Sequence, residues 1–147
     1  MKIIHAYDIE IKQWKHEPVE KFYGENSEIE FQLGLGISAR SPENPDICYF
    51  NVVVQRKIEN RNHGEVFNAL VQKTFMVEVG NDKPSVEFYF DLIEKTTFEF
   101  AHIFHKKIQN TNLQGRRTQK PDINELRNSI QNEINVWDRT FNKTGLN

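Results

Sequence analysis

The sequence predicts an α+β fold in which a four-stranded antiparallel meander sheet is packed by two C-terminal helices. Three observations lead to this prediction. Apolar and polar residues alternate through most of residues 3–79, which is typical of strands with one buried face. After residue 96, apolar residues recur at steps of three and four, the period of a helix. The segments between the predicted strands are rich in Pro, Gly, Asn and Asp, which favours turns between neighbouring strands.

The first two predicted strands cover residues 3–14 and 28–40. The second has the most regular alternation in the chain, and Gly34 and Gly36 both fall on its outer face. A glycine in a strand either lets another backbone or a partner approach closely, or marks a bulge or bend. We keep both interpretations at these positions.

The next two predicted strands complete the meander. Residues 47–59 are apolar on both faces in their first half, which indicates a central strand, and residues 65–79 follow with regular alternation. Turn residues at 41–46 and 60–64 separate these strands from their predecessors. We therefore expect neighbouring, antiparallel strands joined by short connections.

The first predicted helix starts at Thr96 and runs to about Thr111. Thr96 and Glu99 have the spacing of a capping box, and apolar residues follow at helical intervals. Residues 86–93 fit both a strand and a helix, so periodicity alone does not assign them.

The second predicted helix begins after Asp122 as N-cap, with Glu125 at the third helical position, and ends near Gly145. Its apolar stripe is long for covering one small sheet, so we expect part of it to form a groove or a subunit interface. The predicted interface residues are Ile123, Leu126, Ile130, Ile134 and Trp137.

Length and composition narrow the class of protein. A chain of 147 residues predicts one domain spanning residues 1–147, and a net charge of −2 argues against a dedicated nucleic-acid-binding protein. Cys48 is the single cysteine, which excludes an internal disulfide and favours a reducing compartment. Charges rather than an apolar signal core follow residues 1–5, so we expect a cytoplasmic protein. No apolar run reaches the length of a membrane span, which predicts no membrane insertion.

No catalytic or metal site is predicted. His102 and His105 lie three apart on a predicted helix and can face one metal ion, but no second cluster supplies the remaining ligands. Cys48 lies within an apolar strand, where a thiolate is disfavoured. The chain has no glycine-rich phosphate loop and no nucleophile elbow. We therefore predict no metal, no cofactor and no enzymatic activity.

One charged stretch stands out. Between His105 and Lys120 the chain carries no acidic residue, and its cations are Lys106, Lys107, Arg116, Arg117 and Lys120. This stretch either binds phosphate, nucleic acid or an acidic partner, or is a solvated connector after the end of a helix, where cations are favoured.

Several motifs carry a resemblance to a known family. They are Ile4-x-x-Tyr7-x-Ile9-x-Ile11 followed by Trp14, the strand Glu28-Ile-Glu-Phe-Gln-Leu33, Thr74-Phe-Met-Val77, the helix from Phe98 to Ile108, and Lys120-Pro-Asp-Ile-Asn124 with Leu126. With the order of predicted elements, these motifs make the chain similar to a divergent member of the SecB export-chaperone family over nearly its whole length. Phe104-His105 stands where that family has a Pro-Tyr pair.

The resemblance implies an ATP-independent chaperone in protein transport, a dimer or a dimer of dimers (a homotetramer), that binds non-native polypeptide in apolar grooves lined by aromatic residues. Aromatic residues make up 12% of the chain, and large rings suit an adaptable binding surface as well as a core. The candidate polypeptide-binding residues are Trp14, Phe22, Tyr23, Phe88, Tyr89 and Phe90. The alternative is a specific interaction module that binds one folded partner, such as an antitoxin-associated, immunity or phage regulatory protein.

Overall fold

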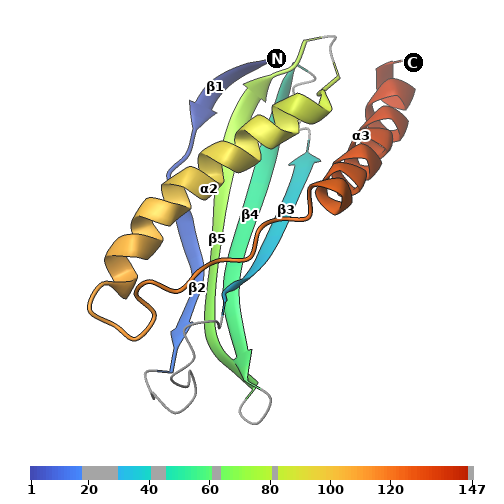
Figure 1. Ribbon diagram of the computed structural model, residues 1–147. Coiled ribbons are helices and arrows are strands. Elements are labelled where there is room, and N and C mark those ends of the chain that lie inside the picture. The colour runs from blue at the N-terminus through green and yellow to red at the C-terminus, as the bar shows by residue number, and fades with distance from the viewer. Residues whose placement is uncertain (18–29, 41–45, 61–63, 81–82, 146–147) are drawn as a thin grey trace.

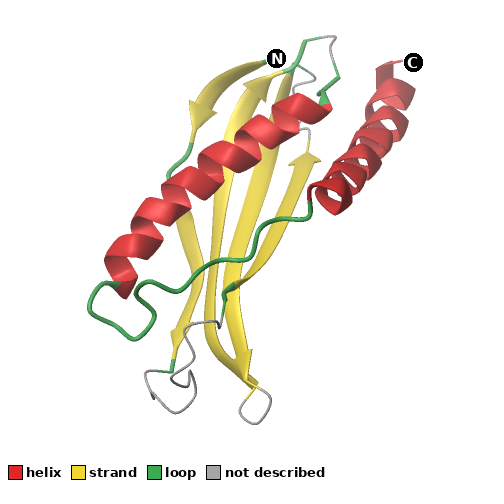
Figure 2. Ribbon diagram, in the orientation of Figure 1, coloured by secondary structure: helices red, strands yellow, loops and turns green. Residues whose placement is uncertain are grey.

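The computed structural model describes residues 1–17, 30–40, 46–60, 64–80 and 83–145, with side chains at residue 60 and at 137–145 left out. It confirms an α+β architecture in which an antiparallel sheet precedes two C-terminal helices (Figure 2). The strands are β1 (Lys2–Ala6), β2 (Glu10–His16), β3 (Gln32–Arg40), β4 (Ile47–Asn60) and β5 (Gly64–Glu78), and the helices are α2 (Val86–Ile108) and α3 (Ile123–Gly145).

The sheet is organised around β5. β4 pairs with one side of β5 and β3 pairs with β4, so β3, β4 and β5 form three strands of the predicted four-stranded meander. The prediction that residues 3–14 begin this meander is wrong, because they pair with β5 and not with β3. β1 and β2 both pair with the other side of β5 (Figure 1). β3 is therefore one terminal strand of the sheet, and β1 and β2 together form the opposite edge.

The predicted strand at residues 3–14 is two strands, so the sheet has five strands rather than four. The chain leaves regular pairing at residues 7–9, between β1 and β2, although the Tyr7 N–H still donates to the Thr74 carbonyl at 3.0 Å. The pairing register shifts within each strand, between Ile3 and His5 in β1 and between Ile11 and Gln13 in β2. Apolar alternation continues through this break, which is why the pattern predicted one strand.

β3 is regular along its whole described length. Its register with β4 shows no shift from Gln32 to Arg40, so the bulge interpretation of Gly34 and Gly36 is wrong. A Cβ atom at Gly34 would lie 3.3 Å from the Gln55 side-chain oxygen, whereas Gly36 faces open space.

Residues 86–93 are helical, and α2 starts ten residues before the predicted N-cap. Ser85 caps the helix by accepting a hydrogen bond from the Phe88 N–H at 3.2 Å. The prediction of a start at Thr96 is wrong because Thr96 is buried in the helix interior, where its hydroxyl donates to the Leu92 carbonyl at 2.8 Å. A threonine inside a helix can donate its hydroxyl hydrogen bond to the carbonyl four residues earlier. The Thr-x-x-Glu spacing is then the same as in a capping box, so the spacing does not distinguish the two.

The N-cap of α3 is confirmed. The Asp122 carboxylate accepts a hydrogen bond from the Glu125 N–H at 3.1 Å, and the helix runs to Gly145 as predicted. Neither described helix is apolar enough to cross a membrane.

The core lies between the sheet and α2, which runs diagonally across one sheet face (Figure 1). Phe31, Phe67 and Phe104 form an aromatic cluster with ring centroids 5.0 to 5.8 Å apart. α3 contacts β3 and α2 at the side of this layer.

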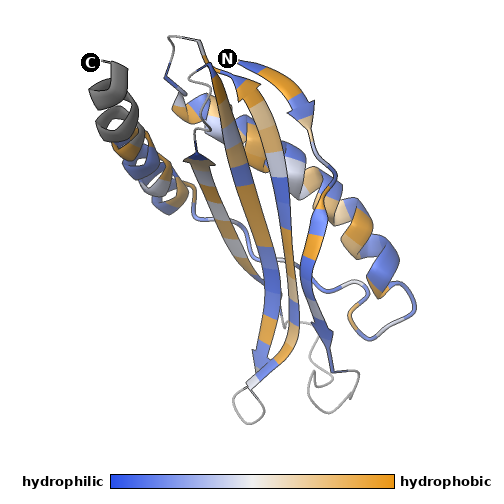
Figure 3. Ribbon diagram, turned by 180° about the vertical axis from the view of Figure 1, so that it is seen from behind, coloured by the Kyte–Doolittle hydropathy of each residue, from blue (hydrophilic) through white to orange (hydrophobic). Residues whose placement is uncertain are grey.

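The opposite sheet face carries no described helix (Figure 3). Its centre is polar: Gln55 donates to the Asn68 side chain at 3.0 Å, and Asn68 in turn donates to Gln13 at 3.4 Å. The apolar residues of the sheet are thus concentrated on the helix-covered side.

Candidate functional site

The four predicted polypeptide-binding aromatics that the structure describes do not converge on one site. Trp14 is half-buried and packs on Phe67 and Phe104, with ring centroids 5.4 and 5.9 Å away. Phe88 is half-buried against Phe50 in the first turns of α2, far along the helix from Phe104. The half-buried ring of Phe90 has the Arg127 guanidinium 5.4 Å above it, and Phe22 and Tyr23 lie outside the described residues.

Tyr89 is fully buried, so the prediction that it is exposed is wrong. Because α2 begins at Val86, position 89 falls on the inward face with Leu92 and Thr96, and its ring packs on Phe50 at 5.4 Å. Its hydroxyl has no hydrogen-bond partner among the described residues, and burial raises the pKa of the phenol.

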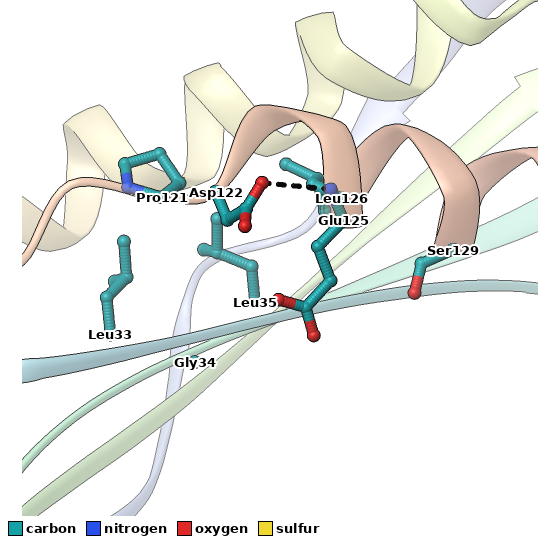
Figure 4. A pocket seen from close by; sticks show the side chains of 8 residues that line it. All are labelled: Leu33, Gly34, Leu35, Pro121, Asp122, Glu125, Leu126 and Ser129. Carbon is teal, nitrogen blue, oxygen red and sulfur yellow. Dashed lines mark hydrogen bonds between the residues drawn. The ribbon is translucent and has the colours of Figure 1, made fainter.

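The structure instead shows a small groove where α3 begins beside β3 (Figure 4). Its volume is about 250 Å³. The lining residues are Leu33, Gly34 and Leu35 from β3, and Pro121, Asp122, Glu125, Leu126 and Ser129 from the start of α3. The leucines supply apolar walls, while the carboxylates and the serine hydroxyl supply a polar rim.

In the part of the chain that the structure describes, the backbone beside this groove is an unpaired strand edge. At the start of β3, the Phe31 N–H donates to the Arg117 carbonyl, and the Phe31 carbonyl accepts from the Gln119 N–H, both at 2.8 Å. Alternate residues of a strand direct their backbone groups to the same side, so those of Leu33 and Leu35 also face outward. Pro121 has no N–H with which to continue this pairing. Among the described residues, no backbone hydrogen bond reaches Leu33 or Leu35 from this side.

The start of α3 is positioned by its cap and by its apolar stripe. The Asp122 cap fixes the first turn, and Leu126, Ile130 and Ile134 are buried, which holds the helix against β3 and α2. Ile123 is exposed, and the side chain of Trp137 lies outside those described. Leu126 is therefore the predicted interface residue that lines the groove.

Leu33 and Leu35 were not predicted as site residues from the sequence. Gly34 gave no signal for the groove, because its open side faces Gln55 on the opposite sheet face. That β3 is an edge strand follows only from the strand order, which alternation does not encode.

The histidines and the cysteine show no reactive arrangement. His102 is exposed and packs against the Phe98 ring at 4.8 Å, and His105 is also exposed. Within the described ranges, no three His, Cys, Asp or Glu residues are grouped to hold a metal ion. Cys48 is fully buried, and its burial raises the pKa of the thiol to about 12. At neutral pH this thiol is protonated.

Comparison with protein-family models and with curated proteins finds no match for this chain.

Proposed function

We propose that the protein is an ATP-independent, chaperone-like protein that binds an extended segment of non-native polypeptide in the groove between β3 and α3. The observation that carries this proposal is the edge of β3, unpaired among the described residues, beside a groove that has leucine walls and a polar rim. An extended chain can add to such an edge as a further strand, with main-chain hydrogen bonds giving affinity and pockets taking alternate side chains.

The groove supplies both parts of such an interaction. Leu33 and Leu35 offer outward N–H and C=O groups, and their side chains, with Leu126, form the apolar surface for one side chain of the bound segment. Main-chain pairing is independent of sequence, which suits a protein that binds many non-native chains. No step of this binding consumes a nucleotide.

A substitution in the groove tests the proposal. Ser129→Arg places a long side chain into the pocket from an exposed position, and Asn128→Arg, also exposed, adds the same side chain and charge beside it. We expect Ser129→Arg to weaken binding of a reduced, alkylated test polypeptide about tenfold. Asn128→Arg is expected to bind as the wild type does.

Fluorescence anisotropy measures binding, and light scattering measures protection of an aggregating client. Thermal unfolding checks that both variants fold. Equal binding by the two variants, or no binding of unfolded chains by the wild type, would exclude the groove as the binding site.

We also propose that the protein self-associates as a dimer through the β1–β2 edge, and a dimer of dimers would need a second interface in addition. Ile4, Tyr7 and Ile11 on this edge are exposed by 41 to 44%. Burying such side chains against a second copy is favourable, and an open strand edge can pair with its symmetry mate. Light scattering coupled to gel filtration gives the mass, and a monomer at micromolar concentration would refute this assembly.

The second candidate is an interaction module specific for one folded partner. The polar rim of the groove, formed by Asp122, Glu125 and Ser129, favours it because a small pocket with placed polar groups can select a particular side chain. A pull-down that returns one stoichiometric protein, together with no affinity for unfolded chains, would distinguish this candidate from a chaperone.

A further inference from the structure

A second surface, which adjoins the groove, is formed by the acid-free segment between Glu99 and Asp122. This segment contains five of the 19 Lys and Arg residues of the chain and none of its 21 acidic residues. The remainder of the chain thus carries 14 cations against 21 acids, so charge is strongly segregated. We call residues 106–120 the basic segment.

The backbone of the basic segment is held in place. Leu113 is fully buried, and the two hydrogen bonds of Phe31 fix residues 117–119 alongside the start of β3. Thr118, the bridge partner of Phe31, is half-buried, whereas Arg117 and Gln119 on either side of it are exposed. An ordered backbone presents cations at a lower entropic cost than a flexible loop does.

Two cationic side chains lie over aromatic rings of the core, and the backbone of a third cationic residue pairs beside them. Phe31 pairs with Arg117 through its backbone, and its ring lies 5.0 Å from that of Phe104. The Arg56 guanidinium lies 4.5 Å from the Phe104 ring, and its buried Nε has no hydrogen-bond partner in the described part of the chain. Lys107, one turn further along α2, lies 5.1 Å from the Trp14 ring.

These cations are not neutralised locally. Lys106, Lys107, Arg117 and Lys120 are exposed, and none forms an ion pair with a described residue. The neighbouring acids are Glu30 beside the bridge, and Asp122 and Glu125 at the start of α3, so the cations remain in excess.

The helix dipole explains only part of this charge. Lys106 and Lys107 lie in the last turn of α2, where cations are favoured. Arg117 and Lys120, however, lie outside α2 and before α3, so the C-terminal dipole of α2 gives them no such support.

We propose that the basic segment binds an acidic segment of a partner polypeptide. A nucleic acid fits less well for two reasons. The rest of the chain is acidic and repels a long polyanion. The ring of Trp14 is half-buried beneath Lys107, so it is not free to stack on a base. A short acidic stretch needs only the few cations present here.

The test uses a fluorescein-labelled peptide of alternating Glu and Ser, with a Lys-Ser peptide and an oligothymidylate of matched charge as comparisons. The double variant Arg117→Glu/Lys120→Glu reverses two exposed cations. The control Lys83→Glu/Lys95→Glu makes the same change in net charge at exposed positions, one just before α2 and one in its first half.

We expect the wild type to bind the Glu-Ser peptide at low ionic strength, with affinity falling as salt rises. The Arg117→Glu/Lys120→Glu variant should bind about tenfold more weakly, and the control pair should lose less than about twofold. Arg117→Gln/Lys120→Gln repeats the measurement with charge removed, in case reversal impairs folding.

Three results would overturn the proposal: no binding of the Glu-Ser peptide by the wild type, equal losses in the two double variants, or tighter binding of the oligothymidylate than of the peptide. The last would identify a nucleic-acid surface instead. Because Ser129→Arg acts at the groove, the test of the proposed function with that variant can fail or succeed independently of the peptide test of the basic segment.

Discussion

The ion pair between Lys73 and Glu99 joins the centre of β5 to α2, and it gives a sharp stability prediction. Lys73 Nζ lies 2.5 Å from Glu99 Oε2, and the two side chains are 10% and 38% exposed. The lysine lies in the helix-facing row of β5 between Val71 and Phe75, both of which are buried. Its ammonium group has little access to water, whereas the carboxylate retains substantial access.

This asymmetry predicts unequal costs for the two single substitutions. Glu99→Gln leaves a buried ammonium without its counter-charge, and we expect it to lower the free energy of unfolding by about 2–3 kcal/mol. This is below the roughly 3–5 kcal/mol found when a fully buried pair is broken, because the pair is partly exposed. Lys73→Met removes the buried charge, keeps much of the side-chain volume, and leaves Glu99 free to turn to water. We expect Lys73→Met to cost less than about 1 kcal/mol.

Urea unfolding followed by circular dichroism measures these differences, with the slope of the transition checking that each variant remains two-state. The double variant Lys73→Met/Glu99→Gln should match Lys73→Met, because Glu99→Gln is harmful only when the ammonium is present. If Lys73→Met proved more destabilising than Glu99→Gln, the inference that desolvation of the lysine dominates this pair would be wrong.

Three further predictions concern the core, a helix cap and the thiol. Phe104→Ala should lower the free energy of unfolding by about 3–5 kcal/mol, because its ring is buried in the aromatic cluster. Phe98→Ala, at an exposed position, should change the free energy of unfolding by no more than about 0.5 kcal/mol. Equal effects of the two substitutions in urea unfolding would contradict the packing described here. Ser85→Ala should cost about 1 kcal/mol by removing the cap of α2, and Ser85→Asp should restore stability; no loss would mean that α2 begins elsewhere. Burial raises the pKa of the Cys48 thiol to about 12, so the folded state holds the thiol proton more tightly than the unfolded chain does. The stabilisation of the folded state that results is lost as pH rises from about 9 to 12. Cys48→Ala should show a shallower loss of stability over this range, and rapid alkylation of the native thiol at pH 8 would contradict its burial.

The sequence predicted those elements whose signals are local. The β3–β4–β5 meander follows from alternation and turn residues, and the start of α3 follows from the Asp122 cap, which depends on a bond within one turn. Thr96 shows the limit of local signals, because the same Thr-x-x-Glu spacing occurs inside a helix whose actual cap is Ser85. The groove depends on which strand is terminal in the sheet, and that is set by long-range pairing.

The aromatic richness of the chain serves mainly its core. Phe31, Phe50, Phe67, Phe75 and Phe100 are all essentially inaccessible to solvent, and many of the core rings meet edge to face. In the described part of the chain, the groove proposed to bind polypeptide instead has leucine walls, a polar rim and unpaired backbone groups beside it. Affinity from such a surface comes chiefly from main-chain pairing, which every sequence except proline can supply.

Selectivity would then have to come from charge around the site. The acidic rim at Asp122 and Glu125 lies directly after the cations of Arg117 and Lys120, so opposite charges adjoin along the same side of β3. A polypeptide laid along this side meets cations beside the start of β3 and carboxylates beside the groove. We therefore expect the order of acidic and basic residues along a partner segment, more than its aromatic content, to decide which segments are bound.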